Sequence, residues 1–490
     1  MTTDPHGPTA DLATQGAADL LIRLGSGERT SAAVVSDLLE RIAAVDDPSG
    51  PVGLRSFAAT AADALAVAAE RDAERRAGRL RGPLHGVPVA VKDNIEAAGL
   101  PGAAGSTALV GRPAGDAGLV ARLRHAGAVV IGSTNLSEWA NIRSARSTSG
   151  WSATGGLVAN PWALDRSAGG SSSGSGAALA AGLVPLAVGT ETDGSIVCPA
   201  SLCGVVGLKP TVGTVPTSGV VPISASQDSP GPMARSVDDV ALLFEVLAGR
   251  RVPPPAERPR FVRAATWTTG HPATDALVDQ VTEALSQRGE HLVERDVAVA
   301  DEQVGSDELA VLLAELVDGL DDYLAARPGS GVRSLADVVA HEDACADVEL
   351  AHFGHDLFLA ALATGGRRGD AYGPARARNL AWATGTCLVP ALEGADVLLA
   401  PAYGPAWKSD LVVGGHGSAL DSGATTPAAI AGWPIMSVPI GVVGGLPVGA
   451  ALIARPGQEA VLLEAARRVE ACTAELGPLP PVAWRESDRG

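Results

Sequence analysis

Short valine-rich runs alternate with helix-like segments from residue 86 onward, and this alternation limits the possible folds more than any other feature. The clearest runs are GVPVAVKD at 86–93, AGLVARLRHAGAVVIGSTN at 117–135 and AGLVPLAVGTETDG at 181–194. Each run contains an apolar strand candidate, and most are paired with a helix. Because strands that alternate with helices bury a common sheet, the sequence predicts an α/β fold.

The chain is predicted to form a single domain over residues 1–490. Its expected parts are a helical N-terminal region at 1–80, a core at 81–250, a helical cap region at 251–395 and a C-terminal completion of the sheet at 396–490. In the first part, apolar residues recur at helical spacing behind Thr30, a predicted N-cap. The proline-rich RVPPPAERPR at 251–260 is interpreted as a loop, because strand and helix patterns resume after it.

The charge pattern argues against polyanionic partners. The 490 residues carry a formal net charge of −18, and lysine and arginine form no run. Phosphate backbones and acidic lipid surfaces require clustered positive charge, so neither nucleic acid nor membrane is expected as a partner. The first forty residues do not resemble a signal peptide, and no long charge-free apolar span follows. We expect a soluble cytoplasmic protein, either a monomer or a homodimer.

The cysteines indicate neither a zinc site nor a disulfide framework. There are five, an odd number, and only Cys198 and Cys203 lie close together in the sequence. Buried thiols that pack as small apolar groups are the expected outcome. No metal and no other cofactor is predicted.

A glycine-serine tract, SAGGSSSGS at 167–175, is the first sign of chemistry. Apolar sequence resumes directly after it, so it is no linker, and it lacks the Gly-Lys-Ser/Thr ending of a phosphate-binding loop. Its GSSSG letters match a nucleophile elbow centred on Ser172, but the preceding NPWALDRSAG is no apolar strand. A second turn, LAVGTETDGS, does follow an apolar run. It would expose the Ser195 hydroxyl beside successive backbone N–H groups, so Ser195 is the better nucleophile candidate.

The segment VAVKDN at 89–94 offers the base that a serine nucleophile needs. Only three of the 37 basic residues are lysines, namely Lys92, Lys209 and Lys408, which indicates that lysine is kept where a removable proton matters. As a base near neutral pH, Lys92 needs a pKa lowered from about 10.4 to about 7, which burial can achieve. Asp93 would oppose this, but alternation along a strand directs it to the other side.

These motifs, taken in order, resemble the amidase signature family. The resemblance covers nearly the whole chain. It rests on GVPVAVKDNI at 86–95, GSTNLSEWAN at 132–141, SAGGSSSGS at 167–175, GTETDGSIVCPASLCGVVGLKPT at 189–211, QDSPGPMARSV at 227–237 and the tail from AGWPIMSVPIG to GLPVGAALI. It implies an amidase signature fold, in which helices cover both faces of a large mixed β-sheet.

The resemblance also implies a Ser-cisSer-Lys triad that cleaves an amide through an acyl-enzyme. By that resemblance Ser195 is the nucleophile, Lys92 is the base, and Ser171 bridges them after a cis peptide bond from Gly170. The products are a carboxylic acid and ammonia or an amine. The backbone N–H groups expected to hold the oxyanion are those of Thr192, Asp193, Gly194 and Ser195.

Departures from the family pattern narrow the expected substrate. The usual GTDxGGSIR is here GTETDGSIV, with Glu191, Asp193 and Val197 at the changed positions. The buried acid–arginine pair beside the nucleophile is therefore expected to be absent or rebuilt. The strings NLSEWAN and GTETDGSIVCPA most resemble the bacterial peptide amidases, which remove the C-terminal carboxamide of peptides.

Several alternatives stay open from the sequence. They are a broad aliphatic or aryl amidase, an enzyme that forms amides by acyl transfer to an amine, the ammonia-releasing glutaminase component of a glutamine amidotransferase and a catalytically silent binding protein. Trp139, Asn141 and Trp151 are candidates for the substrate pocket, although core packing explains the two tryptophans equally well. Asp228 lies in a SQDSPGP loop and is interpreted as a turn-former.

Overall fold

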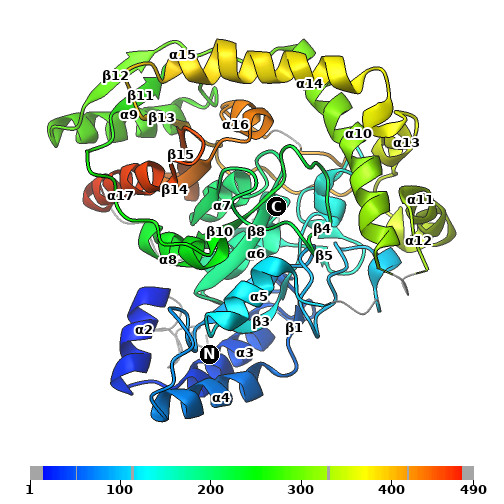
Figure 1. Cartoon of the computed structure of the whole chain (residues 1–490), viewed down its shortest axis with the longest axis vertical. Coiled ribbons are helices and arrows are strands. Elements are labelled where there is room, and N and C mark those ends of the chain that lie inside the picture. The colour runs from blue at the N-terminus through cyan, green and yellow to red at the C-terminus, as the bar shows by residue number, and fades with distance from the viewer. Residues whose placement is uncertain (1–14, 51, 112–114, 328–330, 417–418, 477–490) are drawn as a thin grey trace.

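A single mixed sheet runs through the molecule (Figure 1). The computed structural model describes residues 15–476 except 51, 112–114, 328–330 and 417–418. Within this part, eleven strands lie in the order β1 (Phe57–Thr60), β3 (Val129–Thr134), β2 (Pro88–Lys92), β8 (Leu186–Glu191), β10 (Ser229–Ala234), β9 (Val206–Lys209), β14 (Ile435–Val443), β15 (Leu446–Ala454), β13 (Val397–Pro401), β11 (Phe261–Ala264) and β12 (Leu292–Arg295). The predicted α/β sheet core is confirmed.

The pairing within the sheet is both parallel and antiparallel. β2 runs parallel to β3 and to β8, whereas β10 is antiparallel to both β8 and β9. β14 and β15 form an antiparallel pair, and β13 joins β15 to the parallel strands β11 and β12. Two further pairs of short strands lie outside this sheet, namely β4 (Trp151–Ser152) with β5 (Gly156–Leu157) and β6 (Ala159–Asn160) with β7 (Ala163–Ser167).

Helices cover both faces of the sheet, as the predicted fold requires. α6 (Ser173–Ala180) and α7 (Val197–Cys203) pack on one face near its centre, and α5 (Gly118–His125), α8 (Val237–Ala248), α9 (Pro272–Gln287) and α17 (Glu459–Leu476) pack on the other. Their buried side chains form one continuous apolar core with the strands. Every helix in the described part of the chain is too short or too polar to cross a membrane.

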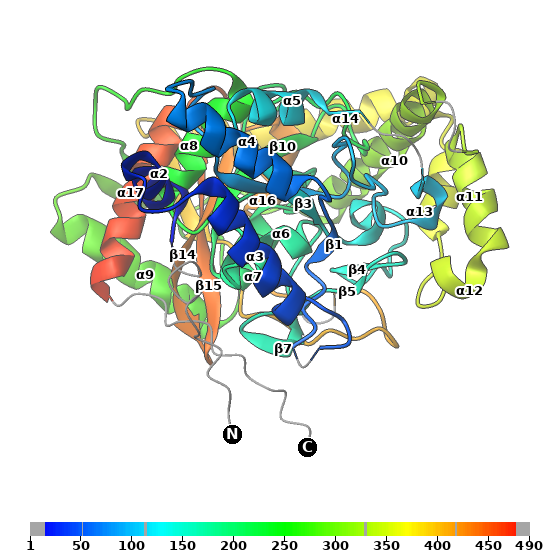
Figure 2. The same cartoon turned by 90° about the horizontal axis from the view of Figure 1, so that it is seen from below.

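The N-terminal part is mainly helical, as predicted, with α2 (Ala17–Ser26), α3 (Ser31–Val45) and α4 (Ala64–Arg76). Thr30 caps α3, since its side chain accepts a 3.2 Å hydrogen bond from Ala33 N. The strand β1 was not predicted and extends the sheet beside β3. Figure 2 shows α3 and α4 on the underside of the molecule. Residues 1–14 of the predicted helical region lie outside the described residues.

The region after residue 300 is helical and lies along one side and the top of the molecule in Figure 1. It contains α10 (Glu302–Ala325), α11 (Leu335–Ala344), α12 (Ala346–Glu349), α13 (Asp356–Leu362), α14 (Tyr372–Leu380), a π-helix (Ala381–Leu388) and α15 (Val389–Ala391). The predicted helical range of 251–395 also includes β11 and β12. These strands belong to the sheet because their parallel pairing next to β13 buries apolar side chains such as Phe261 and Val262.

Candidate active site

The carboxyl ends of two parallel strands bring the candidate base next to the candidate turn. β2 and β8 pair with Val91 opposite Val188. Parallel strands end at the same edge of a sheet, so Lys92 at the end of β2 lies beside the turn that follows β8. α6 begins directly after the glycine-serine tract and packs on the same strands. Three segments distant in sequence therefore meet at one edge.

Lys92 is fully buried and points at the glycine-serine tract. Its Nζ lies 2.6 Å from Ser171 Oγ, 2.9 Å from Thr190 Oγ1 and 3.2 Å from Thr190 O. Burial lowers the pKa of Lys92 to about 7, although the carboxylates of Asp228 and Glu191 act to raise it. A neutral amine has two N–H donors and one lone pair, so it can donate twice to Thr190 and accept from the Ser171 hydroxyl. The surroundings of Lys92 thus match an uncharged amine.

Asp93 faces away from Lys92, as strand alternation predicted. Its carboxylate accepts hydrogen bonds from the backbone N–H groups of Gly102 at 3.1 Å and Ala103 at 3.2 Å. Burial raises the pKa of Asp93 to about 7, although the hydrogen bonds that its carboxylate accepts act to lower it. Asp93 therefore organises the loop after β2 and is not a charge partner of Lys92.

The glycine-serine tract forms a closely packed turn in front of α6. The Gly170–Ser171 peptide bond is cis, which matches the expectation from the sequence. Ser172 Oγ donates to Thr190 O at 3.1 Å and accepts from Thr190 N at 3.2 Å. Ser172 N also donates to Ser195 O at 3.1 Å. Ser172 therefore supports Thr190, which in turn holds Lys92.

Glycine is required inside this tract, and Gly174→Ala is expected to destabilise the fold by at least about 2 kcal/mol. A Cβ at Gly174 would overlap backbone atoms of Ser56 and Asn135, which cannot move aside. The matched control is Gly25→Ala at an exposed position of α2, where a Cβ would meet no atom within 4 Å. That change should stabilise the protein by about 0.4–1 kcal/mol. Urea unfolding of both variants measures the difference, and equal stabilities would contradict this account of the tract.

The turn after β8 presents both a hydroxyl and free backbone donors. Gly194 has a φ of 76°, and a Cβ there would lie 2.7 Å from Tyr403 Oη. Ser195 is 9% exposed, while Lys92 and Ser171 are fully buried. Within the described residues, the backbone N–H groups of residues 192–195 donate to no protein acceptor, and Ser195 Oγ makes no hydrogen bond, including to Ser171 Oγ. Ser195 is thus the member of the predicted triad that is open to solvent.

The acid beside this turn lies near a lysine, but within the described residues no hydrogen bond or ion pair joins the two, so the expected acid–arginine pair has no direct equivalent here. Glu191 Oε2 accepts hydrogen bonds from Ile196 N at 2.6 Å and Val197 N at 2.9 Å, and thereby fixes the backbone next to Ser195. Burial raises the pKa of Glu191, and the charge of Lys209 opposes that shift. Lys209 is fully buried and donates to the Trp433 carbonyl at 2.7 Å. Burial lowers the pKa of Lys209 to about 8.

Ser195 opens into a cavity of about 450 Å³, called here the Ser195 cavity. Asn141 lines it and donates a 3.1 Å hydrogen bond to Ser149 Oγ. Asp193 and Asp421 also line it, whereas no lysine or arginine is among its described lining residues. Burial lowers the pKa of His416, a further lining residue, which favours the neutral ring. The described lining of the cavity therefore has two carboxyl side chains and no basic one, while burial raises the pKa of Asp193 and the charge of Lys209 acts to lower it.

The two tryptophans proposed for the pocket pack elsewhere. Trp139 Nε1 donates to Glu342 Oε1 at 3.1 Å, and its ring meets Phe358 edge-on with centroids 5.7 Å apart. Trp151 packs against Phe353 with centroids 5.0 Å apart. Neither is among the described residues that line the Ser195 cavity; Trp139 packs in an apolar cluster, and Trp151 is buried against Phe353. Residues 139–141 have successive positive φ angles of 48°, 53° and 76°, and this turn sends Trp139 inward while Asn141 reaches the cavity.

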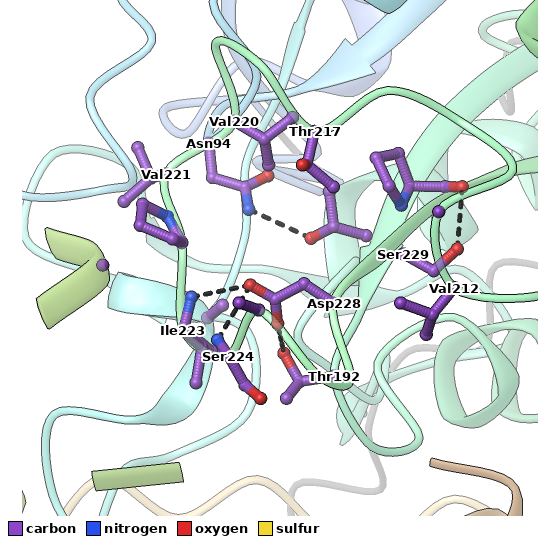
Figure 3. A pocket seen from close by; sticks show the side chains of 17 residues that line it. Asn94, Thr192, Val212, Thr217, Val220, Val221, Ile223, Ser224, Asp228 and Ser229 are labelled. Atoms are coloured by element: carbon purple, nitrogen blue, oxygen red, sulfur yellow. Dashed lines mark hydrogen bonds between the residues drawn. The ribbon is translucent and has the colours of Figure 1, made fainter. Parts of the chain in front are cut away.

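Asp228 both forms a turn, as predicted, and contacts the loop that carries Ser195. Its Oδ2 accepts hydrogen bonds from Ile223 N at 2.8 Å and Ser224 N at 2.9 Å, and Thr192 Oγ1 donates to its Oδ1 at 2.6 Å. Burial raises the pKa of Asp228 to about 6, although these hydrogen bonds act to lower it. Figure 3 shows Asp228 with these partners on the wall of a second cavity.

Sequence reasoning missed several residues of this site. Thr190 belongs to the recognised GTETDG motif and lies at a strand end, as Lys92 does. Its place there, two residues before Thr192, could have indicated a contact with Lys92. Tyr403, Trp407 and His416 lie in the connection between β13 and α16 (Thr425–Ala431), which has neither periodicity nor a motif. Only the fold brings that connection to the Ser195 cavity.

Comparison with known proteins agrees with this geometry. The family model described as Amidase matches residues 33–463. The solved peptide amidase of Stenotrophomonas maltophilia is 41% identical, with a TM-score of 0.89 over 97% of this chain and 99% of that one. A peptide amidase in complex with the competitive inhibitor chymostatin is 41% identical, with a TM-score of 0.90 over 96% of this chain and 100% of that one. The fold and the matching model therefore define an amidase.

The chain belongs to the amidase family. A further similar protein carries a different name. A glutamyl-tRNA(Gln) amidotransferase component from Symbiobacterium thermophilum is 36% identical over 472 residues, which span 90% of this chain and 93% of that protein.

Proposed function

We propose that this amidase hydrolyses the C-terminal carboxamide of peptides to a carboxylate and ammonia. The observation that carries the proposal is the buried Lys92, whose pKa is lowered to about 7 and whose Nζ lies 2.6 Å from Ser171 Oγ. A lysine in this state is a general base at neutral pH. Ser195 is the nucleophile, and Ser171 relays its proton to Lys92.

The first half-reaction forms an acyl-enzyme. Ser195 Oγ attacks the amide carbon while its proton passes to Ser171, and the Ser171 proton passes to Lys92. The N–H groups of residues 192–195 hold the oxyanion, each contributing about 3–4 kcal/mol by analogy with other oxyanion holes. The Ser195–Ser171 hydrogen bond is absent in the described structure. Catalytic hydrogen bonds of this kind commonly tighten only when substrate is bound.

The acyl-enzyme is complete only when ammonia has left, and the second half-reaction then hydrolyses it and returns the enzyme to its starting state. Lys92 gives the proton back through Ser171 to the amide nitrogen, the C–N bond breaks and ammonia leaves. Water then attacks the acyl carbon, its proton follows the same path to Lys92, and the carboxylic acid departs as the Ser195 hydroxyl re-forms. Each proton removed is returned, so no cofactor is needed.

The acidic lining of the Ser195 cavity supports a neutral carboxamide as the group that binds. Asp193 and Asp421 disfavour a substrate with a carboxylate near the reacting carbon, and they favour release of the carboxylate product. Free glutamine carries such a carboxylate, and no cation lines the described cavity to receive it. This observation, together with the 41% identity to solved peptide amidases, favours peptide amides over glutamine.

A substrate panel tests this assignment directly. Ammonia release by the wild-type enzyme should give the highest kcat/KM for peptide amides, lower values for free amino-acid amides and the lowest for glutamine, which binds poorly beside Asp193 and Asp421. Higher values for aryl or simple aliphatic amides would replace the peptide assignment with a broad amidase. If glutamine were the best substrate, the amidotransferase alternative would be favoured instead.

The pH dependence of activity should report Lys92. Only the neutral amine can accept a proton, so kcat/KM should rise with pH through a midpoint near the pKa of about 7 and then level off. Asp228 raises the pKa of Lys92, so Asp228→Asn should move this midpoint to lower pH. A profile that is flat from about pH 6 to 9, or a midpoint that Asp228→Asn leaves unmoved, would contradict the role of Lys92.

We further propose that the chain acts as one amidase domain over residues 1–490, in the cytoplasm and as a monomer or homodimer. The single sheet supports one domain, because its strands come from positions between 57 and 454. The net charge of −18 supports a small amide or peptide as partner and argues against nucleic acid.

A further inference from the structure

A second cavity of about 210 Å³ adjoins the Ser195 cavity, and it is called here the side cavity. Ala140, Thr192 and Ile223 line both cavities, so the two share a wall beside the catalytic turn. At its inner end the side cavity is lined by Asn94 and Thr190, which hydrogen bond to each other at 3.0 Å (Figure 3). Thr190 also accepts a hydrogen bond from Lys92, so a residue that lines this cavity is in direct contact with the proposed base.

The side cavity opens to solvent on another segment of the chain. Gly213 and Thr217 line it and are exposed, in the loop that follows β9. Neither residue lines the Ser195 cavity. The side cavity thus reaches solvent at a segment that the Ser195 cavity does not use, and its lining extends from there to Thr190, the hydrogen-bond partner of Lys92.

The lining of the side cavity suits an apolar amine. Its walls are mostly apolar, formed by Val212, Val220, Val221, Pro222 and Ile223. Asp228 supplies a carboxylate. Asn94 is 3% exposed, and its Oδ1 is buried without a hydrogen-bond partner in the described structure. A free carbonyl oxygen and a carboxylate are acceptors for the N–H groups of an amine or ammonium, and the valines would contact its substituent.

The size of the side cavity exceeds what ammonia needs. A molecule of the size of water takes up about 30 Å³, whereas a cavity of about 150 Å³ holds benzene. A volume of about 210 Å³ therefore accepts a benzyl group or a branched alkyl group. We propose that the side cavity receives the amine portion of N-substituted amides, so that this enzyme cleaves secondary amides of apolar amines in addition to primary carboxamides. This inference rests on the proposed function.

The reaction of such a substrate balances without a further reactant. The Ser195 Oγ–carbon bond forms, and the carbon–nitrogen bond of the amide breaks. The proton lost by Ser195 passes through Ser171 and Lys92 to the leaving nitrogen, and the free amine departs through the side cavity. Water then hydrolyses the acyl-enzyme to the carboxylic acid and restores Ser195.

Paired substrates test the inference. A peptide amide is compared with the N-benzyl amide of the same peptide, with ammonia and benzylamine quantified separately. The wild type should cleave both. Thr217→Trp narrows the mouth at an exposed position and should lower kcat/KM for the N-benzyl amide by at least about tenfold, with less than about twofold change for the primary amide. The matched control is Ser218→Trp, at the next residue, which is exposed and lines neither cavity. It should leave both values unchanged.

Binding of benzylamine, measured by calorimetry, gives a readout that does not depend on turnover. The wild type should bind it, and Thr217→Trp should weaken binding. If the primary amide is cleaved but the N-benzyl amide is not, the inference fails and the proposed function stands. If Thr217→Trp slows both substrates equally, the side cavity holds the acyl portion and the inference also fails. If neither substrate is cleaved, the proposed function and this inference both fail.

Discussion

Replacing Ser195 with alanine is expected to lower kcat for peptide-amide hydrolysis by roughly 10⁵-fold or more, as loss of a catalytic serine does in other acyl-enzyme hydrolases. The change removes the hydroxyl that forms the acyl-enzyme, while the free N–H groups of residues 192–195 remain. A residual rate above the uncatalysed reaction should therefore persist. Ammonia release at saturating substrate measures the loss. Intact-protein mass spectrometry should show an acyl adduct in the wild type only.

Ser172→Ala is the matched control, because Ser172 is a buried serine that lies in the same pair of turns. Its hydroxyl exchanges two hydrogen bonds with the Thr190 backbone, so its loss should cost about 1–3 kcal/mol of stability. Catalysis itself should largely survive, since Ser172 transfers no proton. Full activity in Ser195→Ala, or an equal loss in both variants, would place the nucleophile elsewhere.

Replacing Lys92 with arginine should lower kcat/KM by about 10³-fold or more, because a guanidinium is never neutral and cannot accept the proton. Lys92→Met is a second variant for the case in which the larger arginine prevents folding. Methionine fills the buried position but has no proton to exchange. Both variants should keep this low activity at every pH, without the rise that the wild type shows near pH 7. Lys408→Arg is the control, at a lysine whose side chain is 71% exposed, and it should keep full activity.

The stability of the methionine variant offers an independent check on the state of Lys92. In the wild type its folded pKa of about 7 lies below its unfolded value, so the unfolded state binds more protons between these two values. The free energy of unfolding contributed by Lys92 therefore rises with pH over that interval. Lys92→Met should remove this contribution from urea-unfolding data. Retained turnover in either variant would exclude Lys92 as the base.

The parts of the site that lie in continuous motifs could be predicted because local patterns determine them. The alternation of β2 directs Lys92 and Asp93 to opposite sides, and the parallel pairing of β2 with β8 follows from an α/β arrangement. These two facts are enough to bring Lys92 to the turn that bears Ser195. The cis bond before Ser171 was expected only from resemblance, because no local pattern indicates it.

The remainder of the site depends on contacts that leave no trace in local sequence. Trp139 and Trp151 have the same apolar character whether they line a pocket or pack in a core. What places them is contact with Glu342 and Phe353, which lie about 200 residues later in the chain. β1 was missed because its four residues, FAAT, form too short a strand for period-two alternation to show.

The turn that carries Ser195 is completed by residues made much later. Thr426 Oγ1 donates to Asp193 Oδ2 at 2.9 Å across 233 positions, and Tyr403 packs over Gly194. During synthesis, Lys92, Ser171 and Ser195 all leave the ribosome before this support exists. The nascent chain therefore carries these three residues before the groups that support their turn, and the turn can reach the described geometry only after residue 426 has been made.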